Sequence, residues 1–228
     1  MADAAPASLD SVRHFLYVAD PLCSWCYGFA PVMDKLAAHF AGRLPVRVVM
    51  GGLRAGNIKP MRAEDKAYIH SAWARVAEAS GQSFDHAFFD REGFIYDTEP
   101  ACRAVVTVRE WGPGAAIDPL AFKARISSAF YGHNRDVTDP DVVIAVAEES
   151  GFDAAQFRDK FHSADIRNAT FRDFLTAQEM GVTGFPMLAA GSAATGYALV
   201  TNGYRPIDGL VEAIESWLAK GAPVTKAG

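Results

Sequence analysis

The chain has 228 residues, of which 50% are hydrophobic, so it is long enough to bury a full core. Its net charge of -5 comes from 22 Lys+Arg and 27 Asp+Glu without a long run of either sign, which excludes a basic surface for nucleic acid or anionic lipid. No stretch reaches the roughly 18 apolar residues of a membrane span, and the first residues lack the pattern of a secretory signal. We therefore expect a cytoplasmic protein that binds neither nucleic acid nor membranes.

The chain opens with a predicted strand, helix and strand. Residues 14–19, "HFLYVA", form a short apolar run that ends at Asp20-Pro21, and a second run, "VRVVM", covers 46–50. The segment between them places Val32, Met33, Leu36, Ala37 and Phe40 on one helical face. This pattern predicts a βαβ unit with parallel strands.

The middle of the chain is predicted to be helical. Asp118-Pro119 and Asp139-Pro140 each offer an N-cap followed by a proline in the first helical turn. Gly151 and Gly181 stand where helices commonly end. We predict helices near 62–80, 99–111, 119–131, 140–150, 154–163 and 170–180. A hairpin formed by "PMLAAG" and "YALVTNGYR" and a final helix in "PIDGLVEAIESWLAKG" should follow.

The three cysteines point to catalysis or metal binding, because an odd and small number does not suit a secreted disulfide scaffold. Cys23 and Cys26 stand in the sequence "DPLCSWCYGFAP", where the first strand turns into the helix. A structural zinc site normally needs four ligands, and one C-x-x-C pair with scattered histidines does not supply them. We expect no metal, and we expect Cys102 to be a small buried residue.

The positions of the two thiols favour disulfide exchange. A thiol at a helix N-terminus is stabilised as the thiolate by unpaired backbone N–H groups, so Cys23 should be the nucleophile. Cys26 lies one turn further along the same face, where it can resolve a mixed disulfide at Cys23.

With these motifs the chain resembles the DsbA-like branch of the thioredoxin superfamily, and within it the leaderless FrnE-type group. The resemblance rests on "CSWC" at 23–26, Pro31, "TEPACRAV" at 98–105 and "GVTGFP" at 181–186. It implies an α/β thioredoxin fold with a large inserted all-helical domain. The core would comprise residues 1–61 and 181–228, and the insertion residues 62–180.

The resemblance also implies the parts of a site. Pro186 would follow a cis peptide bond, which leaves the backbone of Phe185 free to pair with an extended substrate. Ser24 and Trp25 would tune the redox couple, and Trp25 would also contact substrate. The partners would be cysteine-containing proteins or peptides, with glutathione or a thioredoxin system for recycling and no bound cofactor.

One position departs from the family pattern. Six residues before Cys23, relatives often carry a buried carboxylate that moves protons for the resolving thiol, and here that position is Tyr17. Proton transfer must therefore differ, and Asp20 is a nearby candidate.

Two alternative functions and one surface prediction remain. The chain could be a non-catalytic, redox-sensitive adaptor that binds a partner for proteolysis. It could also be a glutathione-dependent isomerase or transferase of the same fold, although those proteins generally have serine at the position of Cys23. A peptide-binding groove is predicted from five aromatic residues: Trp25, Phe29, Trp73, Phe89 and Phe185.

Overall fold

The computed structural model describes residues 12–112 and 114–220, and its sheet has four strands in the order β2-β1-β3-β4. The strands are β1 (His14–Ala19), β2 (Val46–Met50), β3 (Met187–Ser192) and β4 (Gly196–Asn202). β1 pairs in parallel with β2 and antiparallel with β3, and β3 forms an antiparallel hairpin with β4. The predicted βαβ opening and the late hairpin are both confirmed.

The two faces of the sheet bury different partners, as the alternation of side chains along a strand requires. Phe15 and Tyr17 of β1 join the large core that contains Leu36 and Leu210, from the helices before β2 and after β4. Leu16 and Val18 point to the other face, where they belong to a smaller apolar cluster with Ala177.

The predicted first helix is divided in two. α1 (Ser24–Gly28) and α2 (Ala30–His39) meet at Phe29, and Pro31 stands in the first turn of α2. Proline has no backbone N–H and is tolerated in a first turn, which accounts for the new helix start at this point. The thiol pair therefore lies on a helix of only five residues.

Seven further helices follow along the described part of the chain. They are α3 (Ala63–Ser80), α4 (Glu99–Arg109), α5 (Pro119–Tyr131), α6 (Pro140–Glu149), α7 (Ala154–His162), α8 (Ala164–Glu179) and α9 (Leu210–Ala219). A short 3-10 helix, η1 (His86–Asp90), was not predicted. α8 begins six residues before the predicted start because the Ser163 side chain accepts a hydrogen bond from the Ile166 amide and caps it there.

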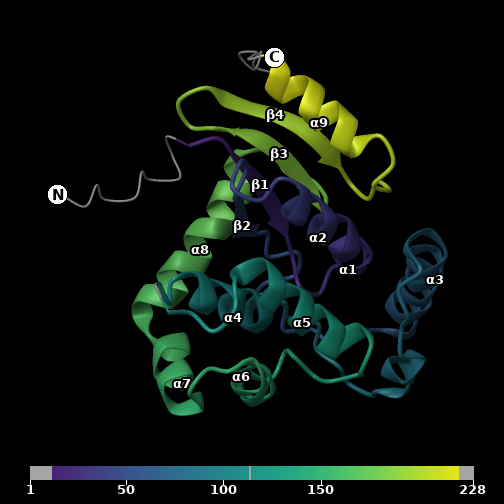
Figure 1. Ribbon diagram of the computed structural model, residues 1–228. Helices are drawn as coiled ribbons and strands as arrows, with labels where there is room; N and C mark the ends of the chain where they lie inside the picture. The colour runs from purple at the N-terminus through teal and green to yellow at the C-terminus, as the bar shows by residue number, and fades with distance from the viewer. Residues whose placement is uncertain (1–11, 113, 221–228) are drawn as a thin grey trace.

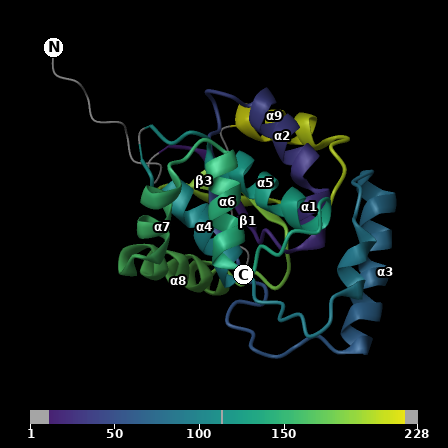
Figure 2. The ribbon, with the colours of Figure 1, turned by 90° about the horizontal axis from the view of Figure 1, so that it is seen from below.

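The helices surround the sheet unevenly. Figure 1 shows α9 beside β4, α4 to α7 gathered on the opposite side of the molecule, and α3 set apart next to α1. The view from below in Figure 2 shows the same separation of α3 from α4 to α8. α8 contacts β2 directly, so part of the predicted insertion lies against the sheet. The division at residues 61/62 and 180/181 remains a prediction.

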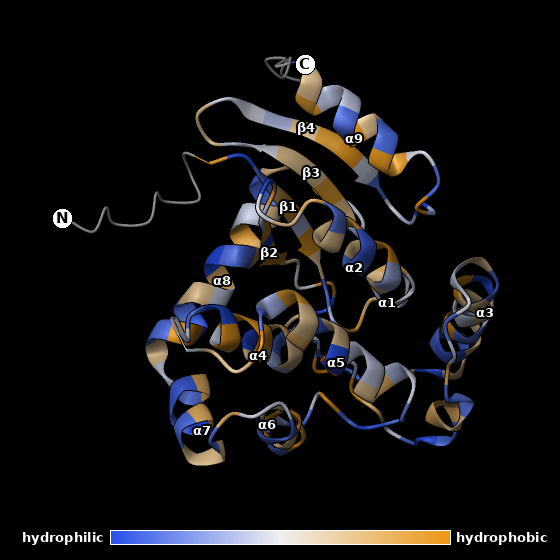
Figure 3. Ribbon diagram, viewed as in Figure 1, coloured by the Kyte–Doolittle hydropathy of each residue, from blue (hydrophilic) through white to orange (hydrophobic). Residues whose placement is uncertain are grey.

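Hydropathy follows this packing. In Figure 3 the exposed helix α9 carries both hydrophobic and hydrophilic residues, as expected of a helix with one buried face. Among the residues that the structure describes, no helix combines the length and the apolar character that crossing a bilayer would require.

Candidate active site

The two thiols lie at the junction that the sequence predicted. Cys23 is the N-cap residue of α1, with φ -95° and ψ 116°, and Cys26 lies one turn into that helix. Cys23 keeps 7% of its surface exposed, whereas Cys26 is fully buried. Both are free thiols, so the structure describes the reduced form.

The surroundings of the two sulfurs separate their acidities. A hydrogen bond from the Cys26 side chain is the largest influence on Cys23 and lowers its pKa below the usual value of a thiol, with burial opposing it. The backbone amide of Cys26 adds to the lowering. Burial raises the pKa of Cys26 well above its usual value. The backbone amide of Cys26 is one of the unpaired N–H groups at the start of α1 that the sequence predicted to stabilise the Cys23 thiolate.

Phe185 and Pro186 lie next to this pair, at the start of β3. The Phe185-Pro186 peptide bond is cis, as the family resemblance implied. The Cys23 thiol donates a hydrogen bond of 3.7 Å to the Phe185 carbonyl. Pro186 is buried, and its carbonyl accepts a hydrogen bond from the Gly203 amide. The Phe185 backbone is thus within reach of the Cys23 sulfur.

A cavity of about 270 Å³ opens beside Cys23. Its wall comes from five parts of the chain: the start of α1, the loop after β2, one face of α3, Tyr96 before α4, and the segment that contains Phe185. The lining residues include Trp25, Leu53, Arg54, Tyr68, Trp73 and Arg75. Leu53 and Tyr68 are among the exposed large apolar side chains of the protein. The cavity can therefore accept a partly apolar group next to the reactive sulfur.

The predicted aromatic groove is found only in part. Trp25, Trp73 and Phe185 line the cavity with Ser24, and Trp25 also packs against Tyr204 at a ring distance of 5.5 Å. Phe29 is fully buried and Phe89 is not part of the wall. Trp73 is only 1% exposed, since its ring is enclosed by neighbouring aromatic side chains.

Asp20, the predicted candidate for proton transfer, is occupied by structural contacts. Its carboxylate accepts hydrogen bonds from the amides of Leu22 at 2.8 Å and Leu53 at 2.7 Å. The thiol of Cys102 donates to the same carboxylate at 3.4 Å. Cys102 is fully buried, as predicted, and it helps Asp20 hold the loop after β2 against the start of α1.

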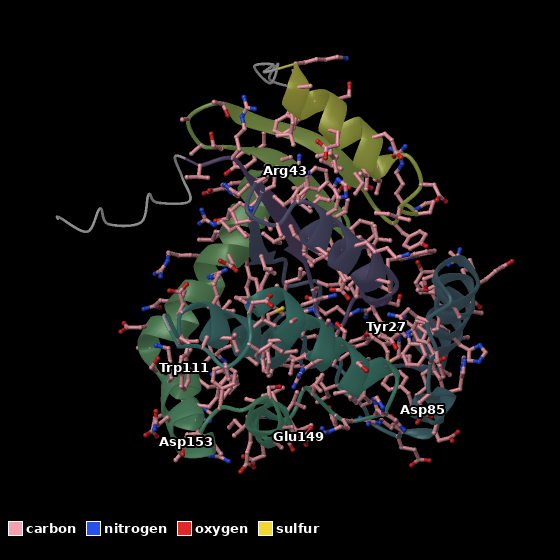
Figure 4. The ribbon with its side chains drawn as sticks, viewed as in Figure 1. Tyr27, Arg43, Asp85, Trp111, Glu149 and Asp153 are labelled. Atoms are coloured by element: carbon pink, nitrogen blue, oxygen red, sulfur yellow. The ribbon has the colours of Figure 1, made fainter. Side chains whose placement is uncertain are left out.

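Two hydrogen bonds join Tyr27 of α1 to the segment that follows α3. The Tyr27 hydroxyl donates to the Ser83 carbonyl at 3.1 Å, and the Gln82 side chain donates to the Tyr27 carbonyl at 3.2 Å. Figure 4 shows Tyr27 in this position, between the two helices. These hydrogen bonds join α1, at whose start the thiols lie, to the segment that follows α3, the helix that forms one wall of the cavity.

Lys123 of α5 is a buried residue close to Cys26 that was not predicted as part of the site. Its ammonium donates a hydrogen bond of 2.8 Å to the Cys26 carbonyl. The available signal was its position three residues after Leu120 and three before Ile126, on the apolar face of α5. Tyr17 is also fully buried there, and burial and the nearby Cys26 thiol raise the pKa of its hydroxyl well above the usual value. No group of three or more His, Cys, Asp or Glu side chains in the described residues could hold a metal ion.

Comparisons with known proteins agree with this arrangement. A protein from Nitrosomonas europaea, described as a candidate protein disulfide isomerase, is 35% identical, with a TM-score of 0.84 over 93% of this chain and 100% of that one. The cytosolic disulfide reductase DsbM from Pseudomonas aeruginosa is 24% identical, with a TM-score of 0.74 over 91% of this chain and 99% of that one. DsbM has also been solved with GSH.

Curated relatives carry a different description. The ClpXP adapter protein SpxH from Halalkalibacterium halodurans is 26% identical over 167 residues, which are 72% of this chain and 53% of that protein. The chain therefore spans about half the length of the curated relatives it matches. The DSBA-like thioredoxin domain matches residues 16–215, nearly the whole of the described chain. The chain belongs to the DSBA-like thioredoxin domain family.

Proposed function

We propose that the protein is a thiol-disulfide oxidoreductase that acts through Cys23 and Cys26. The observation that carries the proposal is the difference between the two thiols: Cys23 has a lowered pKa and borders a cavity, and Cys26 is buried one turn behind it. The thiolate is the attacking species in disulfide exchange, so this difference supports attack by Cys23 and resolution by Cys26.

The reaction would proceed in two exchanges. The Cys23 thiolate attacks a substrate disulfide, forms a mixed disulfide with one substrate sulfur and releases the other as a thiolate. Cys26, after losing its proton, attacks Cys23, and the second substrate sulfur leaves. The substrate gains two electrons and the protein keeps a Cys23-Cys26 disulfide; the reverse sequence oxidises a dithiol. Electrons move only between sulfur atoms, so no bound cofactor is needed.

The surroundings support roles for the remaining predicted site residues. Trp25 and Phe185 line the cavity and would contact the substrate, with the Phe185 carbonyl close to the sulfur that a substrate must approach. Ser24 and Trp25 separate the two cysteines and would tune the redox couple. Pro186 would hold this backbone in place. We place the protein in the cytoplasm, as the description of DsbM suggests, with glutathione or a thioredoxin system for recycling and cysteine-containing peptides or proteins as substrates.

The test is reduction of a protein disulfide in a glutathione buffer. Cys23→Ser should abolish exchange, and Cys26→Ser should accumulate a mixed disulfide with the substrate that mass spectrometry maps to Cys23. Cys102→Ala is the matched control and should retain exchange, because Cys102 is buried away from the cavity. Full activity of Cys23→Ser would refute the proposal.

An adaptor function is the second candidate, because the curated relatives are described as ClpXP adapter proteins. An adaptor would form a stable complex with its partner without consuming reductant. Multiple turnovers of a disulfide per protein molecule would favour the enzyme. A single stoichiometric reaction with lasting complex formation would favour the adaptor. The isomerase or transferase alternative shares the fold, but here a cysteine stands at position 23.

A further inference from the structure

Lys123 is a buried lysine without an acidic partner. It is 1% exposed, and no carboxylate lies within ion-pair distance of it in the described part of the chain. Its hydrogen bond goes instead to the main-chain carbonyl of Cys26, at 2.8 Å. An unpaired ammonium in such a place is costly, and burial lowers the pKa of the Lys123 side chain. The amine can therefore give up and take a proton more readily than an exposed lysine.

The groups that face Lys123 come from three elements and the turn between two of them. Tyr17 of β1 lies with its ring centroid 5.9 Å from the lysine nitrogen, and burial together with the neighbouring Cys26 and Cys23 thiols raises the pKa of its hydroxyl well above the usual value, so it stays protonated. Four groups also act on Lys123: Cys23 and Cys26 of α1, Asp20 in the turn before them, and Asp34 of α2. Asp20 already accepts three hydrogen bonds and Asp34 is exposed; neither forms a direct ion pair with Lys123, and both act on it only through their charge.

The resolving thiol needs a proton acceptor at one step. Burial raises the pKa of Cys26, and two further contributions, the hydrogen bond and the charge of Cys23, raise it as well. Both contributions of Cys23 end once its sulfur is bonded to a substrate. The positive charge that Lys123 carries once it is protonated then favours the Cys26 thiolate against burial, so a proton on the Lys123 amine and a thiolate at Cys26 stabilise each other. β1 places the buried Tyr17 side chain beside the two thiols, not a carboxylate that could take this proton.

We propose that Lys123 accepts the proton of the Cys26 thiol when Cys26 resolves the mixed disulfide, an inference that rests on the exchange reaction proposed above. The proton passes from the Cys26 sulfur to the Lys123 amine, which becomes an ammonium beside the thiolate. The thiolate forms a bond with the Cys23 sulfur while the bond from Cys23 to the substrate breaks. The substrate sulfur leaves with the electron pair of that bond as a thiolate, and Lys123 then returns its proton to solvent.

Two-phase kinetics separate this step from the first exchange. The reduced protein is mixed with a chromogenic aromatic disulfide that releases one coloured thiolate when Cys23 attacks and a second when Cys26 resolves. Lys123→Gln keeps a hydrogen-bond donor near the Cys26 carbonyl but has no amine. It should slow the second phase at least about tenfold at pH 7 and move its pH midpoint up by about one pH unit or more. The first phase should keep a pH midpoint below that of an ordinary thiol.

Lys66→Gln is the matched control, because the Lys66 ammonium also donates to main-chain carbonyls, those of Phe89 and Arg91, away from the cavity. It should leave both phases unchanged. A Lys123→Gln protein that is folded by circular dichroism and shows the second phase of the wild type refutes the role of Lys123. If the wild type shows no first phase, the exchange reaction proposed above is refuted instead.

The pH dependence of the second phase in the wild type is a test that needs no variant. With Lys123 as acceptor, the rate of the second phase should level off once the Lys123 amine has lost its proton, at a pH below about 10.4, the ordinary pKa of a lysine, because burial lowers the pKa of Lys123. A rate that continues to rise past that pH would show that the buried thiol loses its proton without Lys123, and the proposal would fail.

Discussion

Cys23, Cys26 and Cys102 are all buried, but their surroundings differ. The Cys26 side chain donates a hydrogen bond to the Cys23 sulfur and lowers the pKa of that thiol. Burial raises the pKa of Cys26, and it also raises the pKa of Cys102, whose neighbour Asp20 adds to the effect. The thiolate is the reactive form, so reactivity should differ more than exposure does.

Alkylation of the reduced protein tests this difference. Because the pKa of Cys23 is lowered, its thiolate fraction rises at a pH below that of an ordinary thiol, and Cys23 should be labelled at least about tenfold faster than the other two at pH 7. The rate should fall when the pH drops through that lowered pKa. Mass mapping identifies the site, and a fast label on Cys26 would reverse the assigned roles.

Gly51 controls the position of Phe185. A Cβ atom at residue 51 would come within 2.1 Å of the Phe185 ring, whereas one at Gly184 would meet nothing within 4 Å. Gly51→Ala should therefore displace the ring, lower the free energy of unfolding by about 1–3 kcal/mol and slow exchange at Cys23. Gly184→Ala is the control and should keep both values close to those of the wild type. Equal behaviour of the two variants in urea unfolding and in exchange assays would contradict this.

Residue types and spacing were enough to identify the thiol pair, but they did not identify what surrounds it. The C-x-x-C motif and the turn at Phe185-Pro186 are local patterns, and both were recognised. The contact of Lys123 with Cys26 joins residues 97 positions apart, and a lysine in a helical sequence normally signals a solvated face. The position of Asp20 before the thiols predicts a role in proton transfer, but its carboxylate accepts three hydrogen bonds that the sequence does not show.

At the scale of elements, a partly buried ion pair joins α4 and α8 to the edge of the sheet. The Asp173 carboxylate of α8 accepts hydrogen bonds from the Arg109 guanidinium at 2.6 Å and from the Met50 amide at 2.8 Å. Arg109 also donates to the Val48 carbonyl at 2.9 Å. This cluster holds β2 and the loop after it, which carries Leu53 into the cavity wall.

Asp173→Ala should lower the free energy of unfolding by about 1–3 kcal/mol, because it leaves the Met50 amide without its acceptor and removes one of the two carboxylates paired with Arg109, the other being Glu110. The value is below that of a fully buried pair because the Arg109 side chain stays 22% exposed. Urea unfolding of the reduced protein measures it. Glu179→Ala, an exposed acidic residue at the end of the same helix, is the control and should change stability by less than about 0.5 kcal/mol. A similarly small change in Asp173→Ala would show that the ion pair is not needed.

Helix boundaries were predictable where capping signals were strong. Asp118 and Asp139 cap α5 and α6 at the expected positions, since each aspartate accepts hydrogen bonds from the first turn. The start of α8 was missed because Ser163 follows α7 without an intervening loop, so one residue ends one helix and caps the next. The spacing of apolar residues along the sequence gives no sign of where one helix ends and the next begins at such a junction.

At the scale of the whole molecule, the cavity joins the sheet region to α3. The thiols, Trp25 and Phe185 come from elements attached to the sheet, while Tyr68 and Arg75 come from α3. Arg54 and Arg75 add positive charge to a wall that is otherwise partly apolar. A small neutral disulfide can reach Cys23 without touching α3, whereas a peptide must lie along this wall. The contribution of α3 should therefore depend on the size of the substrate.

Tyr68→Ala tests that dependence. The tyrosine is 68% exposed and lines the cavity, so its removal should slow exchange with a cysteine-containing peptide disulfide roughly fivefold, or about 1 kcal/mol. Exchange with an uncharged small disulfide of equal reactivity should stay within about twofold, because that substrate needs no contact with α3. Phe171→Ala on α8 is a matched control, since Phe171 is an aromatic residue that is 61% exposed and lies outside the cavity. If Tyr68→Ala slows both substrates equally, or slows neither, α3 does not contact the substrate and its aromatic residues serve only to pack the protein.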